Sequence, residues 1–143
     1  MMSSIENFED VRPYYDHEAH ARLQEIIKDP LFMRLVNYLW PGMTPEEIAA
    51  KAERVNSAMG FQLEFMHPAI RTIVERSSNG LSCEEFEHLD PKHAYLFIAN
   101  HRDILLDSAI LQILLVEHGF PTSEITFGDN LMEKGFITHF GKL

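Results

Sequence analysis

The sequence predicts an α/β protein, in which an N-terminal helical layer precedes the first strand–helix–strand part of a parallel sheet. Apolar residues recur at helical spacing over residues 16–76. The apolar and aromatic run Tyr95–Ala99 has the length of a buried strand. A helical pattern at about 104–118 and a short apolar run at 125–127 follow it. This order indicates two parallel strands joined by a right-handed crossover.

The helical layer is expected to begin with two helices. Asp16 is a suitable N-cap for the first, and the break at Asp29-Pro30 separates it from the second. The second helix continues the apolar spacing until Pro41-Gly42 ends it. Both helices therefore carry an apolar stripe that must be buried against other elements.

Two more helices are expected to complete the layer. Thr44-Pro45-Glu46-Glu47 combines a cap residue, proline at the first helical position and glutamate at the third. This helix is expected to run to about Met59, with Gly60 as a kink or an end. The last helix covers 61–76, and the turn residues Ser77–Gly80 close the layer.

From Gly80 the pattern changes to alternating strands and helices. The expected elements are a strand at 93–99, a helix at 104–118, a strand at 125–127 and a helical piece at 131–140. The chain is therefore expected to divide into an N-terminal helical region, 1–79, and the start of an α/β domain, 80–143.

Composition limits the classes of function. The chain has 22 acidic and 12 basic residues, a net charge of −10, which argues against a nucleic-acid partner. A single cysteine, Cys83, allows no internal disulfide and suits a reducing cytoplasm. The N-terminus does not resemble a signal peptide, and no run of 18 apolar residues occurs. The expected location is the cytoplasm, and a peripheral position on the inner face of the membrane is compatible with it.

The residues that follow the expected strand at 93–99 are the candidate site, because ligands of open α/β sheets bind at the carboxyl ends of strands. His101 is suited to proton transfer near neutral pH, and Arg102, Asp103 and Asp107 follow it. Asn100–Asp103, with apolar residues and Asp107 after it, resembles the first motif of the glycerolipid acyltransferases. These enzymes acylate glycerol-3-phosphate and 1-acylglycerol-3-phosphate. Leu96–Ala99 and Phe127–Leu131 also fit that pattern.

The resemblance implies acyl transfer from acyl-CoA or acyl-carrier protein to a glycerol-phosphate acceptor in phospholipid synthesis. It makes His101 the catalytic base and Asp107 the acid that orients it. No cofactor and no metal are expected, because the acyl thioester is a co-substrate. Arg102 is a candidate phosphate contact, with a surface charge or a salt bridge to Asp103 as the alternative.

Spacing leaves the identity of the orienting acid open. The family motif is His-x4-Asp, whereas Asp107 follows His101 after five residues. Positions six apart differ by about 240° around a helix, so His101 must stand in a turn while Asp107 reaches back from the first helical turn. Asp103 and Asp107 share a face, and Asp103 is therefore the alternative orienter.

The resemblance covers about residues 80–143, the first third of such a domain. The family's second motif, with a basic residue, and its Glu-Gly motif for the acceptor phosphate do not occur here. The chain is therefore expected to be a truncated form without detectable glycerol-3-phosphate acylation. Open strand edges also predict self-association.

Two alternatives compete with these expectations. His17 and His20, beside Asp16 and Glu18, have a spacing that metal ligands use, but without a further ligand cluster a solvated helix face is the preferred interpretation. The alternative function is a non-catalytic helical module that binds a partner through an exposed edge or an apolar face.

Overall fold

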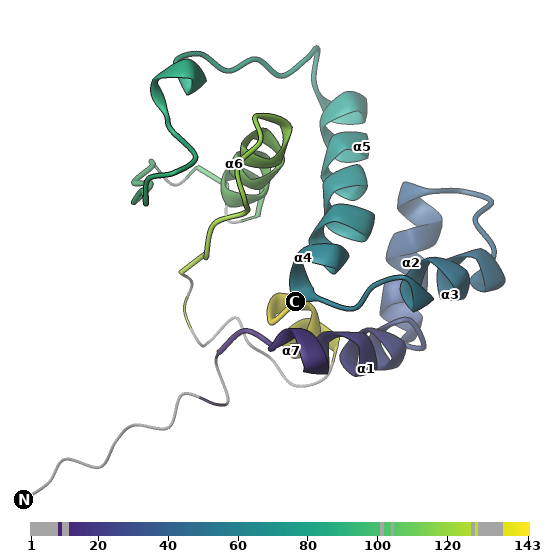
Figure 1. Ribbon diagram of the computed structural model, residues 1–143. Helices are drawn as coiled ribbons and strands as arrows, with labels where there is room; N and C mark the ends of the chain where they lie inside the picture. Colours follow the sequence, from purple (N-terminus) through teal and green to yellow (C-terminus); the bar gives the residue numbers. More distant parts are fainter. Residues whose placement is uncertain (1–8, 10–11, 101, 104, 127, 129–135) are drawn as a thin grey trace, which may run out of the picture. The chain divides into compact units, whose positions relative to one another are not determined.

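The computed structural model describes residues 9, 12–100, 102–103, 105–126, 128 and 136–143. Helices make up 58% of the structure, and no strand occurs among the described residues (Figure 1). The expected strand–helix–strand arrangement is therefore wrong. The chain forms two compact units: unit 1 comprises 1–64 and 127–143, and unit 2 comprises 65–126. These unit boundaries differ from the domain boundary between residues 79 and 80 that the change in sequence pattern predicted.

Tyr95–Ala99, the run expected to be the first strand, has no regular secondary structure. Residues 94–100 and 120–126 have no assigned secondary structure. A strand is stable only when its N–H and C=O groups join a ladder, and an isolated two-stranded pair is marginal in water. Leu96 and Ile98 are 85% and 88% exposed, so the apolar composition of this run does not produce burial here.

Among its described residues, unit 1 contains five α-helices. They are α1 (Asp16–Ile26), α2 (Pro30–Leu39), α3 (Pro45–Glu53), α4 (Ala58–Phe61) and α7 (Phe136–Gly141). Cap residues near the chain breaks set their starts. Asp29 accepts a hydrogen bond from the backbone N–H of Leu31 at 2.8 Å, and Thr44 forms a reciprocal capping box with Glu47. The starts of α2 and α3 thus agree with the sequence prediction.

Two helix limits in unit 1 differ from expectation. Tyr15, not Asp16, is the N-cap of α1, because the Glu18 carboxylate accepts the Tyr15 N–H at 2.8 Å. Helix α3 ends at Glu53 instead of near Met59. Val55 is buried immediately after that end, and Ser57 accepts the N–H of residue 60 to start α4. A new N-cap therefore interrupts what periodicity alone presents as one helix.

The core of unit 1 is formed by the apolar faces of its first helices. Its members are all less than 4% exposed: Ala19, Leu23, Ile26, Phe32, Val36, Leu39, Ile48, Ala52, Val55 and Phe61. Helix α1 contacts α3, α4 and α7. The stripe read from the sequence over residues 16–76 is thus buried as a helix-on-helix layer in this part of the chain.

The C-terminal segment closes unit 1. Its Phe140 ring meets Phe61 edge to face at 5.6 Å between centroids. The backbone N–H of Tyr14 donates to the carbonyl of Lys142 at 2.8 Å, and the Gln62 side chain donates to the carbonyl of Leu143 at 3.0 Å. The Tyr14–Lys142 contact joins residues near the two ends of the sequence, and the other two link the C-terminal segment to the end of α4.

Proline accounts for an irregular turn before α5 (His67–Ser77). The preceding residues, η1 (Gln62–Met66), form a π-helical turn. Pro68 lacks an N–H, and its ring would clash with the carbonyl four residues earlier in a regular helix. A wider turn at that point relieves this clash and lets the helical direction resume.

Unit 2 is built on α5 and α6 (Leu106–Glu117), with a short 3-10 turn, η2 (Phe86–His88), between them in sequence. Ile70 and Val74 of α5 pack against Ala109 and Ile113 of α6 as a small buried cluster. The two helices are also joined by charge: the guanidinium of Arg71 binds both carboxylate oxygens of Glu117, with Nε to Oε1 at 2.6 Å.

Candidate functional site

The turn before α6 holds the acids that the sequence singled out, and each has a distinct backbone contact. Asp103 Oδ1 accepts the N–H groups of Leu105 and Leu106 at 2.9 and 2.7 Å. Asp107 Oδ2 accepts the N–H groups of Arg102 and Asp103 at 2.5 and 2.9 Å. Asp103 therefore points forward onto the helix start, whereas Asp107 points back onto the preceding turn.

This reciprocal arrangement follows from the unpaired N–H groups at a helix start. The first N–H groups of a helix have no partner within it, and carboxylates satisfy them with a favourable charge. Asp103 accepts the first of them, the N–H of Leu106, although the N-cap position of α6 is Leu105. Asp107 lies in the first turn of α6 and reaches back from it, which is the posture that the His-x5-Asp spacing requires.

The candidate pair of His101 and Asp107 is only partly described. His101 lies outside the described residues, so its distance from Asp107 and from Asp103 stays a prediction. Arg102 is exposed, and its backbone N–H is engaged by Asp107. The strand that was to place His101 at its carboxyl end is absent, because residues 94–100 are unassigned. The helix begins at Leu106, slightly later than expected.

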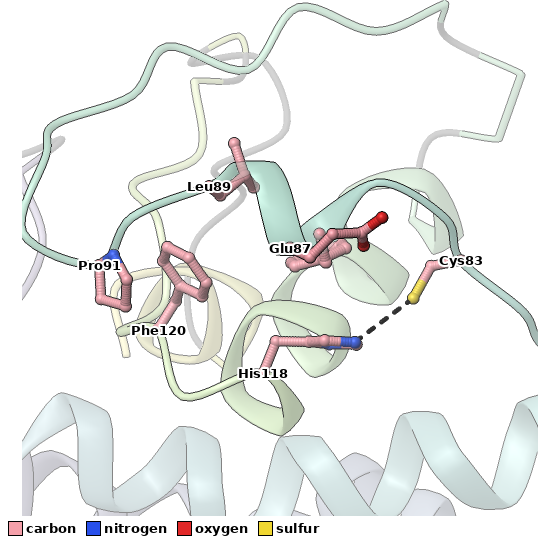
Figure 2. A pocket seen from close by; sticks show the side chains of 7 residues that line it. Cys83, Glu87, Leu89, Pro91, His118 and Phe120 are labelled. Carbon is pink, nitrogen blue, oxygen red and sulfur yellow. Dashed lines mark hydrogen bonds between the residues drawn. The ribbon is translucent and has the colours of Figure 1, made fainter.

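A second group of reactive side chains, which the sequence did not single out, lies elsewhere in unit 2 (Figure 2). The Cys83 thiol lies 3.6 Å from Nε2 of His118. His118 caps the carboxyl end of α6, and its Nδ1 lies 2.7 Å from the carbonyl oxygen of Leu114. The Phe86 ring stacks on the imidazole with 4.2 Å between centroids. Contacts from Cys83, Phe86 and Leu114 thus fix one imidazole.

The carbonyl contact sets the tautomer of His118. A carbonyl oxygen can only accept, so Nδ1 must carry the proton in that hydrogen bond. In the neutral ring Nε2 then has its lone pair free to accept, and Nε2 is the atom that faces Cys83. The arrangement is therefore a thiol, a base and a group that orients the base, which is the general pattern of an activated nucleophile.

An open hollow of about 340 Å³ lies beside this pair (Figure 2). It is lined by Cys83, Phe86, Glu87, Leu89, Pro91, His118 and Phe120. Most of these side chains are apolar, and the described residues of the lining include a carboxylate, Glu87, but no lysine or arginine. This composition favours an uncharged or partly apolar molecule over an anionic one.

Sequence spacing could not have revealed this pair. Cys83 and His118 lie 35 residues apart, and only packing of the η2 segment against the end of α6 brings them together. In the sequence, Cys83 bears only on disulfides, and His118 belongs to no motif. The available signal was a histidine at the end of a predicted helix, where a ring can bond the final carbonyl groups.

The candidate metal pair is not brought together as ligands. Nδ1 of His20 lies 2.8 Å from the carbonyl oxygen of Val55, whereas His17 is exposed and stacks on Tyr15. Across the described residues, no group of three or more His, Cys, Asp or Glu side chains could hold a metal ion. His17 is thus solvent-exposed, whereas His20 is partly buried and contacts a backbone carbonyl outside its own helix.

A further hollow in unit 1, of about 550 Å³, is lined by Trp40, Pro41, Gly42, Met43, Glu47, Ala50, Lys51 and Arg54. Lys51 Nζ lies over the Trp40 ring, 5.6 Å from its centroid. Burial lowers the pKa of Lys51.

Within the part of the chain that is described, no helix has the length and apolarity needed to cross a bilayer.

Comparisons with protein-family models, with curated proteins and with solved structures found no match for this chain.

Proposed function

We propose that the turn before α6 carries the base and acid of an acyl-transfer site. His101 is the base and Asp107 the acid that orients it. The donor is acyl-CoA or acyl-carrier protein, and the acceptor is the hydroxyl of a glycerol phosphate. The resemblance of Asn100–Asp107 to the first motif of the glycerolipid acyltransferases supports this reaction class. The proposal places the chain in phospholipid synthesis, at a membrane surface on the cytoplasmic side.

The posture of Asp107 is the observation that carries the proposal. Its Oδ2 is held by two backbone N–H groups directly after position 101, at 2.5 and 2.9 Å. Asp103 Oδ1 is occupied by the helix start, through Leu105 and Leu106. Of the two acids, Asp107 is therefore the one whose carboxylate is directed toward residues 102 and 103, which directly follow the proposed base in sequence. This assignment follows the family motif despite the extra residue in the spacing.

The proposed chemistry needs only these groups and the two substrates. His101 takes the proton of the acceptor hydroxyl, whose oxygen attacks the thioester carbonyl carbon. The carbon–sulfur bond breaks, and the protonated His101 ring gives its proton to the departing thiolate. Asp107 holds the ring and stabilises its positive form. The exposed guanidinium of Arg102 is the proposed contact for an acceptor or donor phosphate.

An assay of thioester cleavage tests this assignment. It requires no binding site for the acceptor phosphate, because water can replace the acceptor hydroxyl. We expect slow release of CoA from a fatty acyl-CoA, abolished in His101→Ala. Asp107→Asn should lower the rate by about 100-fold, the size of a typical general-base contribution. Asp103→Asn is the matched control, since asparagine caps a helix as well as aspartate.

The outcome of that assay separates the two acids. Equal rates in the wild type and in His101→Ala would remove the base from the mechanism. A loss confined to Asp103→Asn would transfer the orienting role to Asp103. Circular dichroism of each variant checks that α6 still forms.

A partner-binding module is the second candidate function, and one observation favours it. Leu96 and Ile98 are almost fully exposed in a run without regular secondary structure, and contiguous apolar exposure of this kind marks interaction surfaces. We expect concentration-dependent association in light scattering, weakened by Leu96→Asp with Ile98→Asp. A monomer at all concentrations would argue against this surface as a self-association site. The thioester assay is independent of that result.

A further inference from the structure

We propose that Cys83 and His118 form a second reactive site, a nucleophilic thiol that accepts an acyl group from an uncharged ester or thioester. This proposal does not rest on the function of His101 and Asp107. It stands on the Cys83–His118 contact of 3.6 Å, on the carbonyl group that fixes the imidazole, and on the adjoining hollow of about 340 Å³.

The imidazole is held from two sides, so its free nitrogen has a defined direction. Leu114 accepts the Nδ1 proton at 2.7 Å, and the Phe86 ring covers one face at 4.2 Å. Phe120 in turn meets Phe86 edge to face at 6.1 Å between centroids. Nε2 is therefore the acceptor for the Cys83 thiol proton. Pre-organisation of a base beside a thiol is what nucleophilic catalysis requires.

The side chains that line the hollow favour one chemical class of electrophile. Phe86, Leu89, Pro91 and Phe120 offer an apolar wall beside the thiol. Glu87 contributes the lining's acidic charge, and the chain as a whole carries −10. An anionic reagent would be repelled, whereas a neutral acyl compound with an apolar substituent fits both the wall and the charge.

The proposed step balances without an added oxidant or reductant. The thiol proton moves to Nε2 of His118 as Sγ of Cys83 attacks the carbonyl carbon. A new carbon–sulfur bond forms, and the bond from the carbonyl carbon to the leaving oxygen or sulfur breaks. His118 returns its proton to the leaving group. An ester and the thiol thus become a thioester at Cys83 and a free alcohol.

The test uses p-nitrophenyl acetate and the full chain. We expect release of p-nitrophenol in an initial burst and an acetyl mass increase on Cys83, which mass spectrometry assigns unambiguously because the chain has one cysteine. His118→Ala should slow the burst by about 100-fold, the contribution expected of a general base. His88→Asn, an exposed histidine in the η2 segment, is the matched control and should leave the burst unchanged.

Further measurements distinguish a role of His118 as a base from a role in packing. Phe86→Leu removes the stacked ring but keeps His118, so it should slow the burst less than His118→Ala does. Iodoacetamide should alkylate Cys83 faster than anionic iodoacetate, and His118→Ala should slow both reagents. The proposal is overturned if the wild type gives no burst, or if the His118→Ala burst equals the wild-type burst.

Discussion

The two units bury their apolar residues differently, although both are built from helices. In unit 1, residues from α1, α2 and α3, together with Val55 and Phe61, form a broad core, and the C-terminal segment covers its edge. In unit 2, the buried cluster is a narrow contact between α5 and α6, with the charged pair Arg71–Glu117 beside it. Unit 2 also carries the exposed run around Leu96 and both candidate sites.

This difference shows how stability and reactivity are distributed along the chain. Local openings concentrate where few apolar contacts hold a segment. The turn at Arg102–Asp107 and the Cys83–His118 pair are held by hydrogen bonds and ring contacts outside the small core of unit 2. Unit 1 lacks these reactive pairs among its described residues and instead concentrates the large buried side chains.

The largest expected effect comes from truncating the core of unit 1. Leu23 is fully buried, and Leu23→Ala should lower the free energy of unfolding by about 3 kcal/mol. Ile113→Ala in unit 2 should cost less, about 2 kcal/mol, because a small cluster relaxes around the lost atoms more easily. Amide hydrogen exchange measures the two units separately. Leu31→Ala, at a half-exposed position, is the control and should change little.

A smaller effect is expected from the helix cap of α3. Thr44 accepts the backbone N–H of Glu47 at 3.2 Å, and the Glu47 carboxylate accepts the N–H of Thr44 at 2.8 Å. Thr44→Ala should destabilise unit 1 by about 1 kcal/mol in urea unfolding, whereas Thr44→Ser should retain most of the stability. Equal destabilisation by both changes would argue that packing of the threonine methyl group, not the cap, is responsible.

The smallest effect is pH-dependent and also concerns unit 1. Hydrogen bonding from Arg12 lowers the pKa of Glu18 from 4.5 to about 2. Because the folded pKa lies below the unfolded one, this stabilisation is present above about pH 4.5 and is lost as the pH falls toward 2. Glu18→Gln should reduce the loss in free energy of unfolding between pH 4.5 and about pH 2. Arg12→Gln should flatten the same window, and an unchanged slope in both variants would contradict the assignment.

Local signals in the sequence predicted the start of α2, the start of α3 and the approximate extent of α6. Caps and prolines act over three or four residues, so their effect does not depend on the rest of the fold. The end of α3 was missed because Ser57 starts a new helix after buried Val55. Hydrophobic periodicity does not reveal such a restart.

The two predicted strands are absent from the described residues, because a strand depends on contacts that are distant in sequence. Tyr95–Ala99 has the composition of a strand, but a strand needs a distant partner that local composition does not supply. The posture of Asp107 was foreseen from helical geometry, since spacing alone required it to reach back. The Cys83–His118 pair was not foreseen, because it depends on how a short 3-10 turn packs on the end of α6.

The most direct test of the proposed site is the tautomer of the His101 ring, read from its ring ¹⁵N chemical shifts at a pH where the ring is neutral. If Asp107 orients the base, the wild type should populate one tautomer, and Asp107→Asn should populate both. Asp103→Asn should resemble the wild type. A mixed tautomer in the wild type, or a change in Asp103→Asn with none in Asp107→Asn, would contradict the assignment of Asp107 as the orienting acid.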